Sequence, residues 1–284
     1  MKILIAGSSG FVGKSLVNHL SNKYEVYGLS RRESPTTHYK FDVVNPQIKK
    51  LLNDINPDIM IHTMKLPKSI DYYETNKEEG INTEIIGTRN LVDWVVERNR
   101  KFIFMSTDYV YEGKTNNYNE ESETKPVNYY GELKLQAEKI VQENIKNYTI
   151  LRPTVVFGHT LDSNNFLMDI LNAKEKKKIV CDQISNPTDM KVLADYVEGV
   201  IEKDVRELFV ATGPESISRF DFTMMIAEIF NLNKDLFQKV STAELGQIAK
   251  RPLNNGTDSS KIRSYLNYDC SSLYESLNRI KRAT

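Results

Sequence analysis

The chain opens with a short apolar run that leads directly into a glycine-rich turn. Residues 2–6 have the composition of a buried strand, and Gly-Ser-Ser-Gly-Phe-Val-Gly follows at once. Three glycines let the backbone turn tightly, approach a phosphate and bring the next helix close to the strand, while the first amides of that helix favour an anion. The order of strand, glycine turn and helix predicts a binding site for a dinucleotide pyrophosphate, formed by Gly7, Gly10, Phe11, Val12 and Gly13.

Strand-like runs and helical segments alternate through the first half of the chain. The apolar runs are residues 2–6, 24–29, 58–62, 102–106 and 148–151. This alternation predicts an α/β fold with a doubly wound parallel sheet covered by helices on both faces. Long helices are expected at 78–98 and 130–145; they could pair across a homodimer, although core packing explains their apolar residues equally well.

The character of the sequence changes after Arg152-Pro153, where segments shorten and turns multiply. We expect a dinucleotide-binding domain over residues 1–152. Residues 153–284 should form mainly a smaller, substrate-binding lobe, with some segments returning to the sheet. Within this part, helices are predicted at 190–203 and 220–230, and a strand at 208–211.

Composition excludes several classes of partner. The 38 basic residues balance the 38 acidic ones, so the basic stripe that binds nucleic acid is not expected. The four histidines lack metal-ligand spacing, and Cys181 and Cys270 fit a reduced compartment. No apolar run approaches the length of a membrane span or a signal segment. We therefore expect a soluble, cytoplasmic protein that binds no metal, membrane or nucleic acid.

The end of the second predicted strand indicates which dinucleotide is bound. NAD-binding proteins usually place a carboxylate there for the ribose hydroxyl, whereas this chain has Ser30, Arg31 and Arg32. A hydroxyl and two guanidinium groups suit a 2′-phosphate, which favours NADPH over NADH. The alternative is that both arginines face water and Glu33 binds the ribose. Farther on, Asp42-Val43 could meet the adenine edge.

A second set of polar residues follows the strand at 102–106. Thr107 comes at its end, and Tyr130 and Lys134 lie four apart on a predicted helix, which places them on one face. A carbonyl reduced by hydride needs a proton, and a phenol can deliver it. Because an unperturbed phenol has a pKa near 10, the site must supply on the order of 4 kcal/mol. Lys134 is the predicted source, Tyr130 the proton donor and Thr107 a hydrogen-bond donor to the carbonyl oxygen. Tyr130 and Lys134 are also expected to bind the cofactor, Lys134 through the nicotinamide ribose.

Other tyrosines match this pattern less well. Tyr73 and Lys77 have the same spacing, but they precede the strand that ends at Thr107, whereas Tyr130 follows it. Tyr129 has Leu133 four residues on and cannot use Lys134 in the same way. The non-catalytic interpretation is that Tyr130 merely starts a helix and that Lys134 is a solvated charge.

The sequence resembles the extended short-chain dehydrogenase/reductase family, and within it the dTDP-4-dehydrorhamnose reductase group. The resemblance implies a Rossmann fold, a nucleotide-linked 4-keto-6-deoxy sugar as substrate, NADPH or NADH as hydride donor, and the roles argued above for Thr107, Tyr130 and Lys134. The matching stretches span nearly the whole chain: Gly7 to Gly13, Ser106-Thr-Asp-Tyr-Val-Tyr-Glu-Gly113, Pro126 to Lys134, Leu151-Arg152, Asn186-Pro-Thr188, Leu193-Ala194 and Arg251-Pro-Leu-Asn254.

The resemblance also implies further site residues. Thr107, Asp108, Val155 and Arg251 would lie at the substrate, and Thr63-Met64-Lys65 would lie beside the cofactor. Two positions depart from the group. His62 to Lys65 replaces a pair of alanines and is expected to crowd the path of the cofactor. Val155 stands where the group often has a tryptophan, so an aromatic contact to the sugar is missing.

Three functions compete on this basis. The leading one is an NADPH-dependent oxidoreductase of a nucleotide sugar that supplies polysaccharide or other glycoside biosynthesis. A second is an NAD-dependent nucleotide-sugar epimerase or dehydratase, which would need an acidic residue at the end of the second strand. A third is a non-catalytic subunit, because the regulatory subunit of methionine adenosyltransferase resembles the same reductases.

Overall fold

The computed structural model describes residues 1–160 and 165–284. Its internal contacts divide the chain into two compact units. Unit 1 contains residues 1–107, 129–151 and 197–208, and unit 2 contains 108–128, 152–196 and 209–284. The predicted boundary near residue 152 stays a prediction; in the contact division, 108–128 joins unit 2 and 197–208 joins unit 1.

A seven-stranded sheet forms the centre of unit 1. The strand order is β11-β6-β5-β4-β1-β2-β3, and the pairings from β6 to β3 are parallel. The apolar residues of the central strands are buried because helices cover both faces. The strands are β1 (Lys2–Ala6), β2 (Glu25–Ser30), β3 (Tyr39–Lys40), β4 (Ile59–His62), β5 (Lys101–Met105), β6 (Tyr148–Arg152) and β11 (Leu208–Val210).

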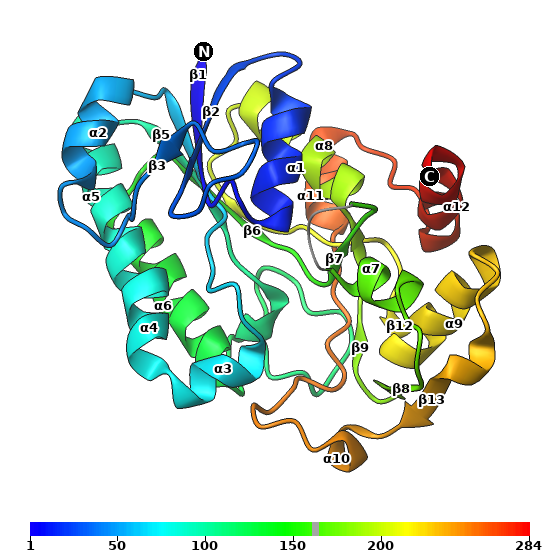
Figure 1. Cartoon of the computed structure of the whole chain (residues 1–284). Helices are drawn as coiled ribbons and strands as arrows, with labels where there is room; N and C mark the ends of the chain where they lie inside the picture. The colour runs from blue at the N-terminus through cyan, green and yellow to red at the C-terminus, as the bar shows by residue number, and fades with distance from the viewer. Residues whose placement is uncertain (161–164) are drawn as a thin grey trace. The chain divides into compact units, whose positions relative to one another are not determined.

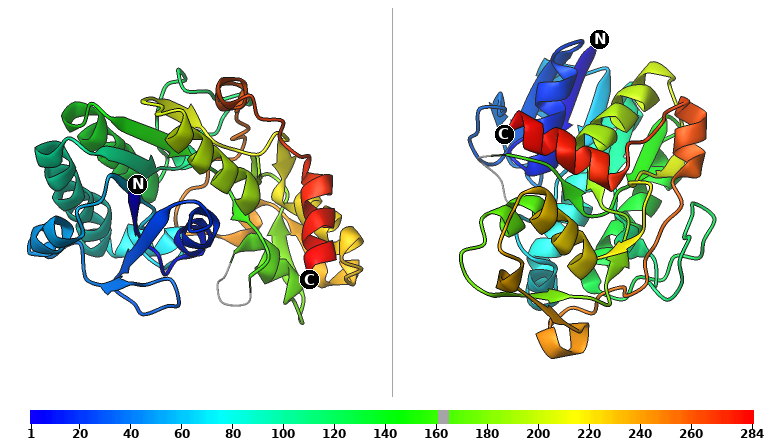
Figure 2. Two further views of the ribbon diagram at one scale, coloured as in Figure 1. Left: turned by 90° about the horizontal axis from the view of Figure 1, so that it is seen from above. Right: turned by 90° about the vertical axis from the view of Figure 1, so that its right-hand side faces the viewer.

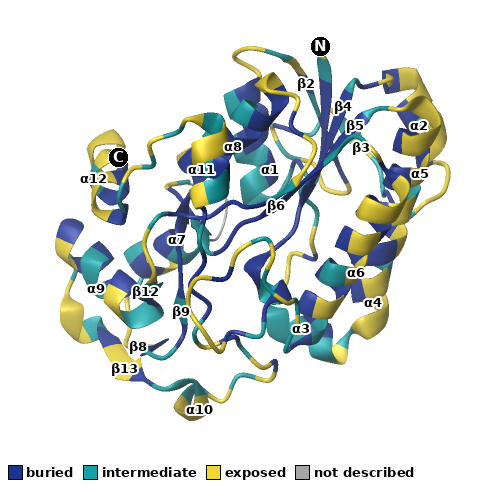
Figure 3. Cartoon of the chain, turned by 180° about the vertical axis from the view of Figure 1, so that it is seen from behind, coloured by how far each residue is buried: buried dark blue, intermediate teal, exposed yellow. Residues whose placement is uncertain are grey.

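Helices lie on both faces of this sheet (Figure 1). On one face α2 (Ile48–Ile55), α5 (Gly87–Arg98) and α6 (Tyr129–Asn144) pack side by side. On the other, α1 (Phe11–Leu20) meets the C-terminal part of α8 (Met190–Glu202), where His19 Nε2 and Glu198 Oε2 are 2.8 Å apart. In Figure 3 the strands are buried while the outer faces of α2 and α5 are exposed. The predicted doubly wound α/β fold is confirmed.

The helix predicted over 78–98 is interrupted by a wider turn. It consists of α4 (Lys77–Ile81), a π-helical turn η1 (Asn82–Ile86) and α5, and a separate short helix α3 (Ile70–Thr75) precedes it. A π turn contains one more residue than an α-helical turn, and this extra residue shifts the buried face of the helix. Ile81, just before the turn, is 39% exposed, whereas Glu84 within it is completely buried.

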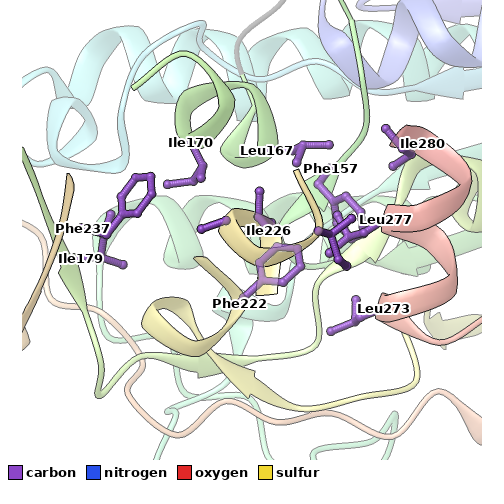
Figure 4. Packing of buried hydrophobic residues seen from close by; sticks show 12 residues of the cluster. Phe157, Leu167, Ile170, Ile179, Phe222, Ile226, Phe237, Leu273, Leu277 and Ile280 are labelled. Carbon is purple, nitrogen blue, oxygen red and sulfur yellow. The ribbon is translucent and has the colours of Figure 1, made fainter. Parts of the chain in front are cut away.

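Unit 2 is built from short strand pairs and helices. Its apolar core joins α7 (Phe166–Leu171), α9 (Arg219–Ile229) and α12 (Leu273–Ala283) around Phe157 and Phe222 (Figure 4). Figure 2 shows α9 and α12 side by side. The strand pairs are β7 (Val156–Phe157) with β10 (Thr188–Asp189), β9 (Ile184–Ser185) with β12 (Ile217–Ser218), and β8 (Lys177–Val180) with β13 (Phe237–Val240). The remaining elements are η2 (Asp108–Val110), η3 (Lys234–Leu236), α10 (Thr242–Leu245) and α11 (Ser260–Leu266).

The described residues contain neither a membrane-crossing helix nor a metal-binding group of side chains. None of the helices in residues 1–160 and 165–284 has the length and apolar character needed to cross a membrane. Within the same residues, no three His, Cys, Asp or Glu side chains are grouped so that they could hold a metal ion.

Candidate active site

The glycines after β1 differ in why they are needed. Gly7 has a φ of 97°, and a Cβ there would lie 2.7 Å from Thr63 Oγ1. A Cβ on Gly13 would lie 2.2 Å from the Gly7 carbonyl oxygen. Packing therefore requires both glycines. At Gly10 the nearest atom would be 3.4 Å away, an ordinary contact, so the protein itself leaves room for a side chain there.

The N-terminus of α1 is suited to an anion. The helix begins at Phe11, followed by Val12, and its N-cap Gly10 has no side chain to occupy the first amides. No acidic residue lies in the first turn to neutralise the positive end of the helix dipole. The residues present fit a pyrophosphate bound against the helix N-terminus, and its binding there stays a prediction.

The end of β2 is tied to the glycine turn. Ser30 Oγ and Ser9 Oγ are 2.6 Å apart. The Arg31 side chain is 52% exposed and lies 3.7 Å from Asp42 Oδ2, while Arg32 is exposed. Ser30 thus fixes the strand end against the turn, and both guanidinium groups remain accessible to a ligand.

The other residues expected around the adenosine half are engaged with the protein. Glu33, the alternative ribose ligand, is 2.9 Å from Lys40 Nζ. Val43 is buried, and its carbonyl accepts a hydrogen bond of 2.8 Å from Asn90 Nδ2. The Asp42 carboxylate faces Arg31. That Asp42 and Val43 meet an adenine stays a prediction.

His62, at the end of β4, belongs to the core. Its Nδ1 accepts a hydrogen bond from the Met64 amide, and its Nε2 lies 2.9 Å from Thr88 Oγ1. The ring packs edge-on against Phe104, with 5.1 Å between centroids. Burial, with a further contribution from the charge of Lys134, holds the pKa of His62 well below its usual value. The imidazole is neutral and fully buried, so the crowding expected from this side chain does not arise.

The three residues after His62 form the edge of the turn next to Gly7. Thr63 Oγ1 donates to the Ala6 carbonyl at 3.0 Å, which fixes the end of β4 to the end of β1. Met64 is partly buried. Lys65 Nζ donates to the carbonyls of Leu66 and Lys68. Thr63, Met64 and Lys65 therefore lie at the strand ends where the resemblance expects the cofactor.

The predicted catalytic residues are all buried, although lysine and threonine are usually exposed. Tyr130 is 6%, Lys134 2% and Thr107 6% exposed. Tyr130 and Lys134 lie in the first two turns of α6, where Glu74 Oε1 accepts a hydrogen bond from the Tyr129 amide at 2.9 Å. A buried lysine needs a specific reason, because desolvation of an ammonium is costly.

The register between α6 and β5 brings the ammonium over that strand. Lys134 Nζ lies 4.5 Å from the centroid of the Phe104 ring. One helical turn further on, Glu138 Oε1 accepts a hydrogen bond of 2.5 Å from Ser106 Oγ. Thr107 follows Ser106 directly. The structure thus places Tyr130 and Lys134 on the helix that packs against the strand leading to Thr107.

Tyr73, which the sequence pattern does not favour as the proton donor, lies next to Tyr130. It belongs to α3 and Lys77 to α4, so this pair does not share a helix face. Lys77 Nζ instead lies 4.9 Å from the centroid of the Tyr129 ring. The rings of Tyr73 and Tyr130 meet edge-on, with 5.0 Å between centroids. Tyr73 is thus a buried neighbour of the predicted proton donor.

Sequence reasoning missed Glu84, which lies in the π turn. Its Oε2 is 3.3 Å from Lys134 Nζ. A signal for it exists in the sequence, because Glu84 continues a buried stripe of helical spacing. The other members of that stripe are Gly80, Thr88, Leu91 and Val95.

Unit 2 holds the predicted substrate residues. Asp108 is 2% exposed, and its Oδ2 accepts a hydrogen bond of 2.8 Å from Asn255 Nδ2. Arg251 Nη1 donates to the Ala249 carbonyl at 2.7 Å. Val155 has a φ of 41°, a conformation that a β-branched residue rarely adopts. Such strain is concentrated at functional sites. That Val155 lies beside a substrate stays a prediction.

A second arginine, not predicted from the sequence, accompanies this group. Burial lowers the pKa of Arg219, Tyr109 and Asp108 oppose that shift, and Arg251 adds to it. The guanidinium carbon lies 5.1 Å from the centroid of the Phe166 ring. Arg219 therefore lies close enough to Asp108 and Arg251 to interact with them electrostatically, and it adds a second positive charge to this part of unit 2.

Comparison with known proteins covers the full length. A curated dTDP-4-dehydrorhamnose reductase of Aggregatibacter actinomycetemcomitans is 26% identical over 298 residues, covering 99% of this chain and 98% of that protein. Methionine adenosyltransferase 2 subunit beta of Xenopus tropicalis is 25% identical, covering 92% and 81%. The crystal structure of dTDP-4-dehydrorhamnose reductase from Bacillus anthracis in complex with NADP superimposes with a TM-score of 0.91 at 26% identity, covering 100% and 99%.

The family model described as RmlD substrate binding domain matches residues 1–283. This match confirms the resemblance predicted from the motifs. The chain belongs to the RmlD substrate binding domain family, within the extended short-chain dehydrogenases/reductases.

Proposed function

We propose that this protein is an NADPH-dependent reductase of a nucleotide-linked 4-keto-6-deoxy sugar. The full-length family match and the relatives named dTDP-4-dehydrorhamnose reductase support the reaction class. An epimerase or dehydratase has less support, because structural neighbours with those names are under 25% identical and indicate the fold alone.

The observation that carries this proposal is the burial of Tyr130 and Lys134 on one face of α6. A solvated lysine could not lower the proton affinity of a phenol appreciably, because water screens its charge. Here the ammonium is 2% exposed and lies over Phe104 of the strand that leads to Thr107. A phenol one helical turn away therefore lies beside a positive charge that bulk water does not screen.

NADPH, when bound, supplies the hydride that reduces the keto carbon. The residues of the chain then serve the oxygen. Thr107 donates a hydrogen bond to it, and the Tyr130 hydroxyl gives it a proton as the carbon–oxygen double bond becomes a single bond. Lys134 stabilises the phenolate that remains. Burial of all three groups excludes water from the reacting atoms.

The end of β2 supports NADPH as the physiological cofactor. Arg31 and Arg32 are exposed beside the glycine turn, and Ser30 is fixed there by Ser9. Two guanidinium groups and a hydroxyl complement a 2′-phosphate. Glu33, which a ribose hydroxyl would need, pairs with Lys40 instead.

Unit 2 supplies cationic groups for the substrate. Arg219 and Arg251 are near enough to influence each other electrostatically. Guanidinium groups bind phosphate oxygens well, so we assign these two arginines to the diphosphate of the nucleotide. Asp108, also in this group, would meet the sugar hydroxyls.

The direct test is an assay of the purified protein with NADPH and freshly prepared dTDP-4-keto-6-deoxyhexose. We expect loss of absorbance at the nicotinamide band and a single reduced sugar product. A matched reaction with a dTDP-hexose that lacks the keto group should consume no NADPH. Isomerised sugar without net cofactor loss would instead identify an epimerase.

No turnover, together with stoichiometric binding to a methionine adenosyltransferase catalytic subunit, would identify a regulatory protein. Two further expectations remain proposals: location in the cytoplasm, and a homodimer that pairs long helices of unit 1. Sedimentation equilibrium would test the homodimer, and a single species of 32.7 kDa would exclude it.

A further inference from the structure

Glu84 is a fully buried carboxylate to which the proposed reaction has assigned no role. It lies in the π turn η1, where the Gly87 amide bonds back to the Asn82 carbonyl, and it is 0% exposed. The π turn and α6 pack together, and Figure 1 shows α3, α4 and α6 as neighbours. An ionised carboxylate persists in such a place only when other groups replace the lost water. π turns within α-helices occur frequently at functional sites.

Both oxygens of this carboxylate have partners from different helices. Oε2 is 3.3 Å from Lys134 Nζ on α6. Oε1 accepts a hydrogen bond of 2.7 Å from the Tyr73 hydroxyl on α3, and that hydroxyl accepts one of 2.9 Å from the Leu66 amide. Burial, followed by the charge of Glu84, raises the pKa of Tyr73, so this phenol stays protonated and donates. Glu84 therefore joins the ammonium on one side to the ring that packs against Tyr130 on the other.

We propose that Glu84 is a positioning residue for the proton donor: its carboxylate holds the Lys134 side chain in place as an ammonium ion behind Tyr130. This inference rests on the proposed reductase function. Lys134 lies over the Phe104 ring and is 2% exposed, so water can stabilise its charge only weakly. The cation–π contact compensates for part of the lost hydration. The carboxylate at 3.3 Å supplies a full opposite charge.

Several other titratable groups surround Glu84 and Lys134, and their charges bear on which group stabilises the ammonium. Lys65 is exposed as a residue, but partial desolvation of its ammonium lowers its pKa, with Glu84 opposing that shift and Lys134 adding to it. His62 on β4 is neutral, because burial and the charge of Lys134 lower its pKa. Tyr73 is a protonated donor. Glu138, one turn along α6 from Lys134, is a second buried carboxylate, but its Oε1 accepts the hydrogen bond from Ser106 Oγ. The carboxylate that lies 3.3 Å from Lys134 Nζ is that of Glu84, so we assign the charge that favours an ammonium there to Glu84.

Replacement of Glu84 tests charge against shape. Glu84→Gln keeps the size and removes the charge, whereas Glu84→Asp keeps the charge and shortens the side chain. If the carboxylate acts through its charge, we expect Glu84→Gln to lower kcat/KM by about 10- to 100-fold near pH 8 and Glu84→Asp by less than about tenfold. If the residue only fills space, the order is reversed, because glutamine is the better fit.

The pH profile of kcat/KM gives a readout that a structural role would not move. A buried ammonium without its counter-charge gives up its proton at lower pH, and a phenol beside it without the negative charge of Glu84 also ionises earlier. Both effects move the alkaline limb of the profile of Glu84→Gln to lower pH, by at least about one unit. A limb at the wild-type position would overturn the proposal.

Thr88→Val is the matched control. Thr88 is buried one turn along the same helix, and its hydroxyl donates to the Glu84 carbonyl and meets His62, so the substitution perturbs the same region without changing a charge. We expect a lower melting temperature and an unmoved alkaline limb. If Glu84→Gln does not fold, Glu84→Asp decides: a limb within about half a pH unit of wild type with less than tenfold loss supports the proposal, and a larger, pH-independent loss overturns it.

Binding of NADPH separates this inference from the proposed function. Lys134 is also a predicted ligand of the cofactor, so fluorescence titration without any sugar should show that the affinity of Glu84→Gln declines at lower pH than that of wild type. If wild type reduces no keto sugar but this shift occurs, the proposed substrate is wrong and the coupling of Glu84 to Lys134 holds. If wild type reduces the sugar and neither profile moves, the role of Glu84 is wrong by itself.

Discussion

The glycine turn after β1 and the buried Lys134–Glu84 pair both belong to unit 1, but different interactions determine their structures. At the turn, a Cβ on Gly13 would collide with the carbonyl of Gly7, six residues away. Beside α6, Lys134 meets Glu84, which is 50 residues away in the sequence. The requirement for glycine at position 13 thus comes from a near neighbour in the chain, whereas the charged group depends on the packing of separate helices.

This difference determines what each region tolerates. A steric requirement is met by having no side chain, so a substitution at the turn acts through backbone displacement. A buried charge is tolerated only while its partner remains, so substitutions near α6 act through electrostatics over several ångströms. The regions should therefore respond differently to the same small change in size, and the variants below test this.

The largest effect on turnover is expected from removing the hydroxyl oxygen of Tyr130 in α6. Tyr130→Phe leaves the ring that packs against Tyr73 and removes the proposed proton donor. Turnover should fall by about two to four orders of magnitude, as expected for loss of a general acid, with NADPH affinity nearly unchanged. Steady-state rates and fluorescence titration measure the two quantities. Unimpaired turnover would remove Tyr130 from the mechanism.

At the glycine turn, we expect a substitution at Gly13 to reduce the stability of the fold. A Cβ at position 13 would lie 2.2 Å from a backbone oxygen, so Gly13→Ala must displace the turn. We expect the free energy of unfolding to fall by about 3 kcal/mol, measured by urea denaturation.

Gly10→Ala is the matched variant within the same turn. Its Cβ would meet its nearest atom at 3.4 Å, so unfolding should change by less than about 0.5 kcal/mol. NADPH affinity should nevertheless fall about tenfold or more, because the methyl group would occupy the space of the pyrophosphate. Unchanged affinity in a stable variant would separate this turn from cofactor binding.

A smaller effect is expected at the end of β2. Arg31→Ala should raise KM for NADPH by about 10- to 100-fold, since hydrogen bonds to a charged group contribute about 1.5–3 kcal/mol. KM for NADH is the internal control and should stay the same. Wild-type constants that are equal for the two cofactors would end the NADPH assignment.

The smallest effect concerns His62, which lies near Lys134 but acts in the core. Because burial holds its pKa below the usual 6.5, its neutral form contributes stability that is present above pH 6.5 and is lost as pH falls below that value. Between pH 7.5 and 5.5 wild type should lose about 1.4 kcal/mol more than His62→Gln. Equal losses would mean that the folded protein protonates His62 normally.

Sequence reasoning succeeded where the signal was local. The strand before Gly7 and the helix carrying Tyr130 and Lys134 were predicted to within about one residue, because strand and helix periods are short-range patterns. The family followed from contiguous motifs and is confirmed. The prediction of one helix over 78–98 was only partly correct, because a regular 3.6-residue period gives no indication of a π turn.

The same limit explains the missed site residues. Tyr73 was dismissed for its order in the chain, yet its ring lies against Tyr130. His62 was expected to obstruct the cofactor, but its ring nitrogens bond to Met64 and Thr88 within the core. A sequence gives the kind of residue and its spacing, whereas the direction of a side chain depends on which helices pack around it.

By itself the sequence determined the doubly wound sheet, the glycine turn and the order of strand end, tyrosine and lysine. These features depend on contacts between near neighbours and on periodicity. Only the tertiary structure decided that Glu84 faces Lys134, that Tyr73 supports both, and that Arg219 joins Arg251. Those pairs lie far apart along the chain, and the energy of a buried charge depends on the surroundings that folding creates.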